Sequence, residues 1–303
     1  MTETGRNYPY TTPPSGYRLP KGIELGKVRL QIADLPRSVS YYENVLGFQV
    51  LERTASSVSL GARGSARVLV ELNEKPGVNA VPQPGRLGLY HFAILLPDRP
   101  SLGRFLQHLS DIGEYAGMSD HLVSEAIYLT DPDGLGIEVY ADKPRTSWAV
   151  NGSNLSMGSL HLDTDALMRA GAGISWDGIP PATVIGHVHL YVDSLETAEK
   201  FYHNAVGFDK VNLEFPGALF MSAGGYHHNL GTNTWAAHSP PSGENDARLL
   251  EWNVSLNSLD DIDRLSESLR QSGYAADSHA NVVQATDPWG TRVRFSAEGD
   301  VSP

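Results

Sequence analysis

The stretch SDHLVSEAIYLTDPDGLGIEVY, residues 119–140, is typical of two strands joined by a tight turn. Residues 125–130 alternate with a period of two, which predicts a half-buried strand. The DPDG segment at 131–134 has turn chemistry, because proline fixes φ and glycine accepts a positive φ. Glu138 then lies among apolar residues of the second strand. A carboxylate there either faces solvent at a sheet edge or needs a partner, since its burial alone is costly.

The composition bounds the possible functions. The chain has 303 residues, enough for two domains with cores of their own. Its net charge of −12 argues against nucleic acid and anionic membranes as partners. It has no cysteine, which excludes disulfides, thiolate nucleophiles and cysteine-based metal sites, whereas its 11 histidines make His/carboxylate sites worth seeking. A polar N-terminus and the lack of a long apolar run predict a soluble, cytoplasmic protein.

Residues 25–54 predict a strand, a turn, a helix and a second strand. The helix is expected to begin near Pro36 and to stop at Gly47, since proline suits a first turn and glycine follows a last one. Two more strands are expected in SSVSLGA, residues 56–62, and ARVLVEL, residues 66–72. The unit is therefore one strand, one helix and three strands, or βαβββ.

This unit recurs along the chain. IGHVHLYVDSLETAEKFYHNAVGFDKV, residues 185–211, overlays the first unit without a gap through the helix. A second unit begins at about Gly88 and ends in DPDGLGIEVY, and a fourth begins at about Glu251 and ends in DPWGTRVRFS. One such unit cannot bury its sheet alone. The sequence predicts an α+β fold in which four βαβββ modules pair into two half-open barrels.

The expected organisation has four parts. An extended arm rich in Pro, Gly and Tyr covers 1–22, and modules one and two cover 23–141. A linker with a short helix covers 142–184, and modules three and four cover 185–298.

The repeat resembles the vicinal oxygen chelate superfamily, which includes glyoxalases, bleomycin-resistance proteins and extradiol dioxygenases. The resemblance covers residues 24–297 and is strongest for the two-domain catechol 2,3-dioxygenases. In that family the first strand of a metal-bearing module carries His and its last strand carries Glu. Module two matches with His91 and Glu138, and module three matches with His187, whereas module one has Lys27 at the position of the histidine. The resemblance therefore implies His91, Glu138 and His187 as metal ligands.

The signature of extradiol enzymes is more specific. It is matched in order by His121, Tyr128, the DPDG turn and Glu138, with a departure at Ser119, where the family prefers Gly, Asn, Thr or an aliphatic residue. The segment GGYHHNLGTNTW, residues 224–235, resembles the paired histidines on the opposite wall of the extradiol pocket. His228 is the better match to their acid/base residue and His227 is the alternative. His121, Tyr128 and His228 are thus the expected catalytic residues.

The resemblance implies an Fe(II)-dependent extradiol dioxygenase that inserts O2 into catechol or a substituted catechol to give a ring-opened semialdehyde. Two histidines and one carboxylate are the ligand set of a non-haem Fe(II) oxygenase, and Mn(II) suits the same ligands. The expected partner is a small aromatic diol. A homo-oligomer is expected only because symmetric oligomers are common.

This interpretation requires modules two and three to share a barrel. If modules one and two pair instead, the cluster becomes Glu71, His91 and Glu138, which favours a glyoxalase-like metal-dependent isomerase or lyase. A metal-free binding protein of the bleomycin-resistance type would not need the three ligands at all. His189 replaces His187 as a ligand if the overlay of the modules slips.

Five other polar and aromatic residues have expected locations. Three are expected to line the substrate pocket: Tyr191, Asn229 and Trp235. Two histidines on predicted helices are expected to face solvent: His108 and His203.

Overall fold

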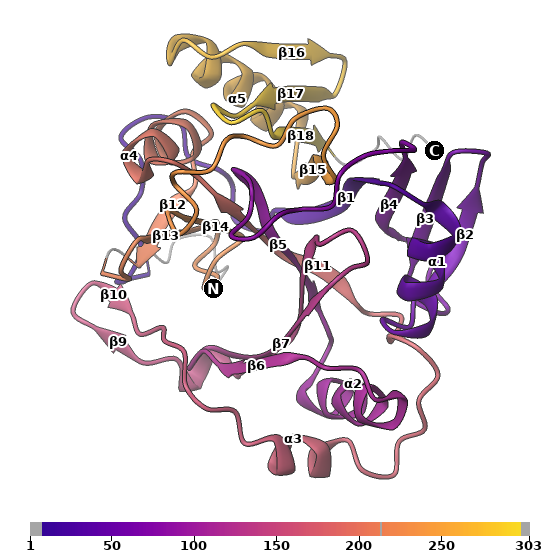
Figure 1. The fold of residues 1–303 in the computed structure, drawn as a ribbon. Helices are drawn as coiled ribbons and strands as arrows, with labels where there is room; N and C mark the ends of the chain where they lie inside the picture. Colours follow the sequence, from indigo (N-terminus) through magenta and orange to yellow (C-terminus); the bar gives the residue numbers. More distant parts are fainter. Residues whose placement is uncertain (1–7, 213, 298–303) are drawn as a thin grey trace.

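The computed structural model of the chain describes residues 8–212 and 214–297. Its strands form two eight-stranded sheets and one small two-stranded sheet (Figure 1). Residues 1–7 of the predicted arm and residue 298 of the last predicted module lie outside this description. Within the described part, no helix combines the length and the apolar character needed to cross a bilayer.

All four predicted modules are present, each with the order βαβββ. Module one consists of β1 (Glu24–Ile32), α1 (Leu35–Asn44), β2 (Gln49–Arg53), β3 (Ser57–Gly61) and β4 (Val68–Glu74). Module two consists of β5 (Gly88–Leu95), α2 (Arg99–Ile112), β6 (Gly117–Asp120), β7 (Ser124–Thr130) and β8 (Gly136–Asp142). Module three consists of β11 (Val184–Tyr191), α4 (Leu195–Ala198) with its π-helical continuation η2 (Glu199–Ala205), β12 (Asp209–Asn212), β13 (Ala218–Ser222) and β14 (Leu230–Asn233). Module four consists of β15 (Arg248–Leu256), α5 (Leu259–Gln271), β16 (Ala276–His279), β17 (Val282–Thr286) and β18 (Arg292–Ala297).

The modules pair as two with three and one with four. One sheet has the order β12-β13-β14-β11-β5-β8-β7-β6, and the other has the order β16-β17-β18-β15-β1-β4-β3-β2. At the centre of each sheet the first strands of two modules run antiparallel, β5 beside β11 and β1 beside β15. The predicted fold is confirmed, and each sheet combines one module from each half of the chain.

The first helix shows how the local sequence sets the elements. The side chain of Asp34 accepts the backbone N–H of Arg37, which caps the helix, and Pro36 lies in the first turn, as predicted. Gly47 follows the helix with φ of 79°, a conformation that favours glycine. The same device recurs in α2, where Asp98 accepts the N–H of Ser101.

Strand β7 differs from the half-buried strand expected for it. Both Glu125 and Ala126 are buried, although they point to opposite faces of the sheet. Glu125 makes an ion pair of 2.6 Å with Arg99 at the start of α2, so the outer face is covered as well as the inner one. The alternation of residues along β7 therefore reflects two buried faces with different neighbours, and neither face is open to solvent.

The two helical histidines expected to face solvent are buried, so this prediction is wrong. His108 stacks on Trp176 with ring centroids 4.3 Å apart, and its Nε2 bonds the carbonyl of Asn44 at 3.1 Å. His203 bonds the carbonyl of Phe208 through Nδ1 at 2.7 Å. Both rings satisfy backbone carbonyls near the ends of helices, which the spacing of apolar residues does not reveal.

The linker lies along the barrel of modules two and three (Figure 1). It contains η1 (Arg145–Ser147), β9 (Val150–Asn151), β10 (Asn154–Leu155) and α3 (Thr164–Ala170). Helix α3 packs closely on α2 at Gly103, where an added Cβ would lie 2.1 Å from the carbonyl oxygen of Leu167. Glycine at this position therefore allows the two helices to touch.

The DPxG turns connect the two barrels, although the sequence suggested only turns. Asp131 of module two accepts the hydroxyl of Tyr42 from α1 at 3.3 Å and two backbone N–H groups of its own turn. Asp287 of module four accepts the hydroxyl of Tyr202 from η2 at 2.8 Å and likewise two N–H groups of its turn. Each barrel thus binds a helix of the other through one buried Asp–Tyr pair.

Replacing Asp287 by alanine should lower the free energy of unfolding by about 2 kcal/mol, because three buried donors lose their acceptor. Urea unfolding followed by circular dichroism would measure the change. Asp277→Ala, on the exposed surface of β16, is the matched control and should change it by less than about 0.5 kcal/mol. Equal effects of the two substitutions would contradict a structural role for the turn.

Candidate active site

Three adjacent strands bring the predicted metal ligands together. Strand β5 lies between β8 and β11, and both Glu138 and His187 are registered opposite Ala93 of β5. His91 lies two residues before Ala93 and so points to the same face. The fully buried methyl group of Ala93 leaves room above it for three larger side chains.

The three donor atoms form a compact triangle. Nε2 of His91 lies 3.0 Å from Oε2 of Glu138 and 3.3 Å from Nε2 of His187, and the third edge is 3.2 Å. An ion that holds ligands at about 2.1 Å and at right angles separates neighbouring donor atoms by about 3.0 Å. The triangle therefore fits three neighbouring positions around one metal ion. Within the described residues, it is the one group of three such side chains whose donors all lie within 4.8 Å.

The protonation of these side chains suits metal binding. Burial lowers the pKa of His91 and of His187 below the usual histidine value, so both rings are neutral at pH 7. Burial alone would raise the pKa of Glu138, but its interactions with His187 and His91 outweigh burial and hold that pKa well below the usual range. Neutral imidazole and ionised carboxylate are the forms that ligate metals.

His189 is held away from the triangle. The side-chain oxygen of Asn233 accepts the backbone N–H of Trp235 at 3.0 Å, so the amide nitrogen of Asn233 faces Nε2 of His189, also at 3.0 Å. This nitrogen of His189 is therefore already occupied by a donor. The arrangement favours His187 over the alternative ligand His189.

A cavity of about 320 Å³ opens beside the triangle. Its described lining contains no Lys or Arg, and aromatic side chains form much of it. The lining residues are Tyr90, His91, Met118, Ser119, His121, Tyr128, Glu138, Met157, Gly158, Ser159, His189, Phe215, Phe220, His228 and Trp235. The cavity brings together the three expected catalytic residues, His121, Tyr128 and His228, with Trp235, which is expected to line the substrate pocket.

His121 and Tyr128 form a hydrogen-bonded pair on the cavity wall. Nδ1–H of His121 donates to the carbonyl of Gly158 at 2.6 Å, so Nε2 is left to accept the hydroxyl of Tyr128 at 2.5 Å. Burial raises the pKa of Tyr128 well above its usual value, which keeps the phenol protonated. The linker residue Gly158 therefore sets the orientation of a side chain from module two.

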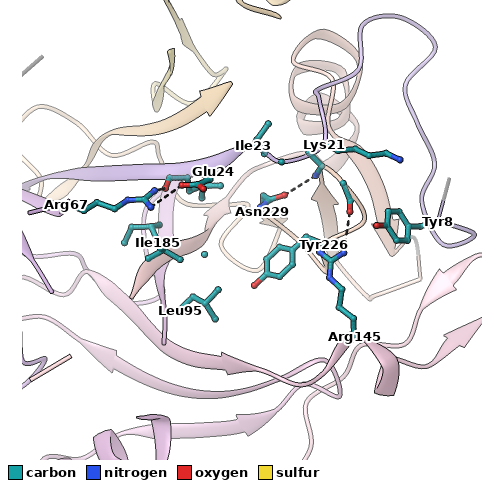
Figure 2. Close-up of a pocket in the computed structure, with 16 residues that line it drawn as sticks. Tyr8, Lys21, Ile23, Glu24, Arg67, Leu95, Arg145, Ile185, Tyr226 and Asn229 are labelled. Carbon is teal, nitrogen blue, oxygen red and sulfur yellow. Dashed lines mark hydrogen bonds and ion pairs between the residues drawn. The ribbon is translucent and has the colours of Figure 1, made fainter. Parts of the chain in front are cut away.

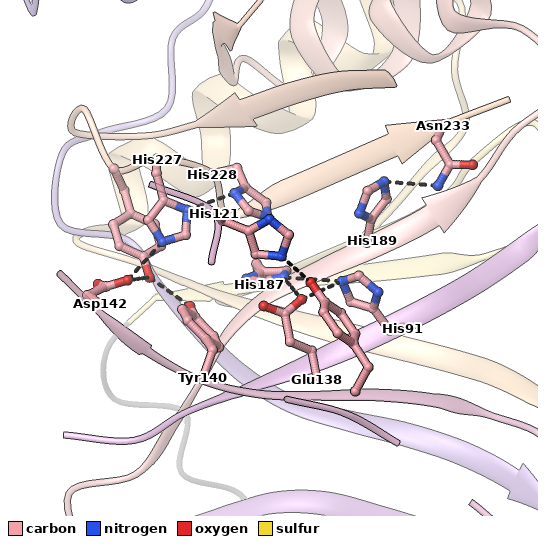
Figure 3. A network of polar contacts seen from close by, with 12 residues as sticks. His91, His121, Glu138, Tyr140, Asp142, His187, His189, His227, His228 and Asn233 are labelled. Carbon is pink, nitrogen blue, oxygen red and sulfur yellow. Dashed lines mark hydrogen bonds and ion pairs between the residues drawn. The ribbon is translucent and has the colours of Figure 1, made fainter. Parts of the chain in front are cut away.

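The paired histidines of module three face different surroundings. His228 lines the cavity, with its ring 4.1 Å from that of His187 between centroids. His227 is fully buried behind it and bonds His228 through the two Nδ1 atoms at 2.7 Å (Figure 3). Nε2 of His227 bonds Oδ1 of Asp142 at 2.9 Å. Burial lowers the pKa of His228 well below the usual histidine value, so its ring is neutral at pH 7.

Sequence reasoning missed Asp142 and the two tyrosines beside it. The hydroxyl of Tyr226 donates to Asp142 at 3.2 Å and lies 2.7 Å from the hydroxyl of Tyr140. Glu138, Tyr140 and Asp142 alternate along β8 and so share one face of the strand. That period of two, continued past Glu138, is the signal that could have found Tyr140 and Asp142, whereas Tyr226 lies outside β8.

A second cavity, of about 600 Å³, is lined in part by Tyr226 (Figure 2). Lys21, Arg67 and Arg145 contribute basic side chains to its lining. Asn229 lines this second cavity, and Tyr191 lines a third one near residues 81–85. Neither residue lines the cavity of about 320 Å³, but Tyr191 shares the third cavity with His91 and Tyr128. That they line the substrate pocket stays a prediction.

The barrel of modules one and four carries an ion pair where the other barrel has its triangle. Lys27, which occupies the position of His187, lies 2.7 Å from Glu71, and Arg29 lies 2.9 Å from the same carboxylate. Glu71 thus belongs to a different sheet from His91 and Glu138. The alternative cluster of Glu71, His91 and Glu138 does not form.

Comparison with known proteins gives one family. The model of the Glyoxalase/Bleomycin resistance protein/Dioxygenase superfamily matches residues 24–139 and 184–295. A catechol-2,3-dioxygenase of Bacillus subtilis (strain 168) is 42% identical over 267 residues, which cover 87% of this chain and 93% of the relative. Two solved structures share the fold. A candidate dioxygenase from Bacillus subtilis superposes with a TM-score of 0.62 at 10% identity, covering 93% of this chain and 87% of the other. Glyoxalase I from Zea mays superposes with a TM-score of 0.54 at 15% identity, covering 91% and 93%.

The folded chain should bind one divalent cation, and Glu138→Gln should weaken that binding by more than about 100-fold, because even residues behind metal ligands contribute 10- to 100-fold. Calorimetric titration of the metal-free protein with Mn(II) would give both the stoichiometry and the affinity.

The matched control is Glu71→Gln, which removes a carboxylate from the barrel that holds the Lys27 ion pair. This variant should still bind one Mn(II) with unchanged affinity. Two ions per chain, or full affinity in Glu138→Gln, would show that the triangle is not the site.

Proposed function

The chain belongs to the Glyoxalase/Bleomycin resistance protein/Dioxygenase superfamily, and we propose that it is an extradiol dioxygenase that uses Fe(II) and O2 to open the ring of catechol or a substituted catechol. The family and the dioxygenase class agree with the expectations from the sequence, given the 42% identity to a catechol-2,3-dioxygenase. The identity of the metal and the substituents of the ring go beyond what the family and the dioxygenase class imply.

The observation that carries the proposal is the triangle of His91, Glu138 and His187 beside a cavity of about 320 Å³. These residues would hold the metal through one face and leave its other face toward the cavity. Bound Fe(II) would supply a Lewis acid for the two catechol oxygens and electrons for O2. Mn(II) suits the same ligands, so the proposal includes it as an alternative ion.

His228 is the proposed acid/base residue. Its neutral imidazole lines the cavity next to His187, within reach of a diol bound at the triangle. There it takes a proton from a catechol hydroxyl and returns it later, as the ring opens. A neutral imidazole suits the first step because one ring nitrogen carries a lone pair that accepts the proton, and the resulting N–H donates it in the second step.

His121 and Tyr128 are proposed to orient the diol. The phenol of Tyr128 is a proton donor that His121 holds in place, and His121 is in turn fixed by the carbonyl of Gly158. Because the phenol ring of Tyr128 is already in position, only its hydroxyl hydrogen has to reorient from His121 to a substrate oxygen. Such a preorganised donor needs no rearrangement of the site.

The cavity wall suits an uncharged flat ring. The ring of Phe215 meets Phe220 edge to face at 5.4 Å and Trp235 in a tilted contact at 6.5 Å, between centroids. Such faces exclude water and pack against an aromatic ring. Tyr90 extends this wall to the triangle, 4.7 Å from the ring of His91 between centroids. The small aromatic diol expected from the sequence matches this lining.

Protein purified without oxygen and loaded with Fe(II) should consume O2 and give a yellow ring-opened product when mixed with catechol and air. In His187→Ala, kcat should fall by at least about 100-fold, because one of three ligands is lost. An oxygen electrode and the visible spectrum would record both, with an Mn(II)-loaded sample beside them to decide the metal.

His279→Ala, at an exposed position of β16 in the other barrel, is the matched control and should keep full activity. Activity unchanged in His187→Ala would move the site elsewhere. No oxygen uptake with any catechol, together with tight binding of Zn(II) or Ni(II), would favour a glyoxalase-like enzyme. Ligand binding without bound metal would favour a binding protein.

A further inference from the structure

We propose that Asp142 is a positioning residue that fixes the tautomer of His228 through His227. The inference rests on the proposed function only for its catalytic consequence, since the tautomer is a property of the folded chain itself. Asp142 does not line the cavity of the triangle, so its influence there passes through the two histidines.

The chain of contacts runs from Asp142, at the C-terminal end of β8, to His228 at the cavity (Figure 3). Oδ1 of Asp142 lies 2.9 Å from Nε2 of His227, and Nδ1 of His227 lies 2.7 Å from Nδ1 of His228. Both ring nitrogens of His227 are therefore engaged, one with a carboxylate and one with the second imidazole.

The donors and acceptors of this chain allow one assignment for neutral rings. An ionised carboxylate only accepts, so Nε2 of His227 must carry the hydrogen that faces Asp142. Nδ1 of a neutral His227 then has a lone pair and must accept from Nδ1–H of His228. Nε2 of His228 is left unprotonated, as the basic nitrogen available to the cavity.

The surroundings hold both rings in this arrangement. His228 is wedged between His187 and Phe220, with centroid distances of 4.1 and 4.9 Å, and within the described residues its Nε2 has no hydrogen-bond partner. The ring of His227 packs on Tyr226 at 4.1 Å and on Trp148 at 5.4 Å. Neither ring can turn over without displacing aromatic neighbours.

Asp142 also accepts a hydrogen bond from a tyrosine hydroxyl. The hydroxyl of Tyr226 donates to Oδ1 of Asp142 and also contacts the hydroxyl of Tyr140 at 2.7 Å. Tyr140 fits there because residue 186 is glycine, where an added Cβ would lie 1.8 Å from the phenol oxygen. Tyr226 also lines the cavity of about 600 Å³, so water reaches this end of the chain of contacts (Figure 2).

The test is a nitrogen-15 NMR spectrum of histidine-labelled, metal-free full-length protein, in which two-bond couplings distinguish Nδ1–H from Nε2–H rings. The wild type should show His228, assigned with His228→Gln, as the Nδ1–H tautomer. In Asp142→Ala the shifts of His228 should move to those of the Nε2–H form or to averaged values, because His227 loses the acceptor that orients it.

Tyr226→Phe is the matched control, since it removes a hydroxyl from Asp142 and leaves the bond between Asp142 and His227. Its His228 should keep the wild-type shifts. Thermal unfolding of each variant would check that it is folded, which the partial exposure of Asp142 favours.

Kinetics of the Fe(II)-loaded proteins supply the second readout. In Asp142→Ala, kcat for catechol should fall at least about tenfold, within the range that general acid–base catalysis contributes, with KM nearly unchanged. Activity loss of the same size in Tyr226→Phe is not expected.

Three results would overturn the proposal: an Nε2–H form of His228 in the wild type, unchanged His228 shifts in Asp142→Ala, or unchanged kcat in Asp142→Ala when the wild type is active. If the wild type opens no catechol ring, the proposed function fails, but the NMR comparison still decides the role of Asp142 in the tautomer.

Discussion

A buried carboxylate is the constraint on which the centre of this protein depends. Glu138 is 3% exposed, and a charge in that position is costly unless other groups stabilise it. The carboxylate is stabilised by His91 from the neighbouring strand and by His187 from the strand beyond, above the small side chain of Ala93. That arrangement exists only if β8, β5 and β11 are neighbours. The stabilisation of Glu138 therefore requires modules two and three to pair.

The second barrel meets the same kind of requirement with protein atoms alone. Glu71 lies between Lys27 and Arg29, which neutralise it without an ion from solution. An ammonium group supplied by the chain is a point charge with fixed stoichiometry, whereas two imidazoles and a carboxylate form a ligand set that suits a divalent cation. One fold thus carries two solutions, and the residue at the first-strand position, Lys27 or His187, decides between them.

The sequence alone predicted the modules and most of the residues that gather around the cavity, because each of these follows from a repeat with a recognisable signature. It left two pairings of the modules open, and the contact of β5 with β11 decides between them. It was insufficient for groups whose importance depends on what faces them. Asp142 looks like the last residue of a strand until His227 is placed against it. Asp131 looks like a turn residue in the sequence, and only the structure shows that it accepts the hydroxyl of Tyr42 from another module. Asn229 and Tyr191 line cavities other than the one of about 320 Å³, because neighbouring residues face different cavities and the twist of a strongly curved sheet cannot be read from the alternation of residues.

The order of the strands also has a consequence for the newly made chain. Each sheet joins one module from the first half of the sequence to one from the second, along the seams β1–β15 and β5–β11. A ribosome that has released only the first half has therefore exposed two open strand edges with no partner yet synthesised, which is the kind of edge that pairs wrongly with other chains. Closure must wait for segments more than 90 residues away in the case of His91 and His187, so folding is set by long loops and is expected to be slow. His187 comes from the second half, so the three proposed metal ligands come together only after both halves of the chain have been assembled.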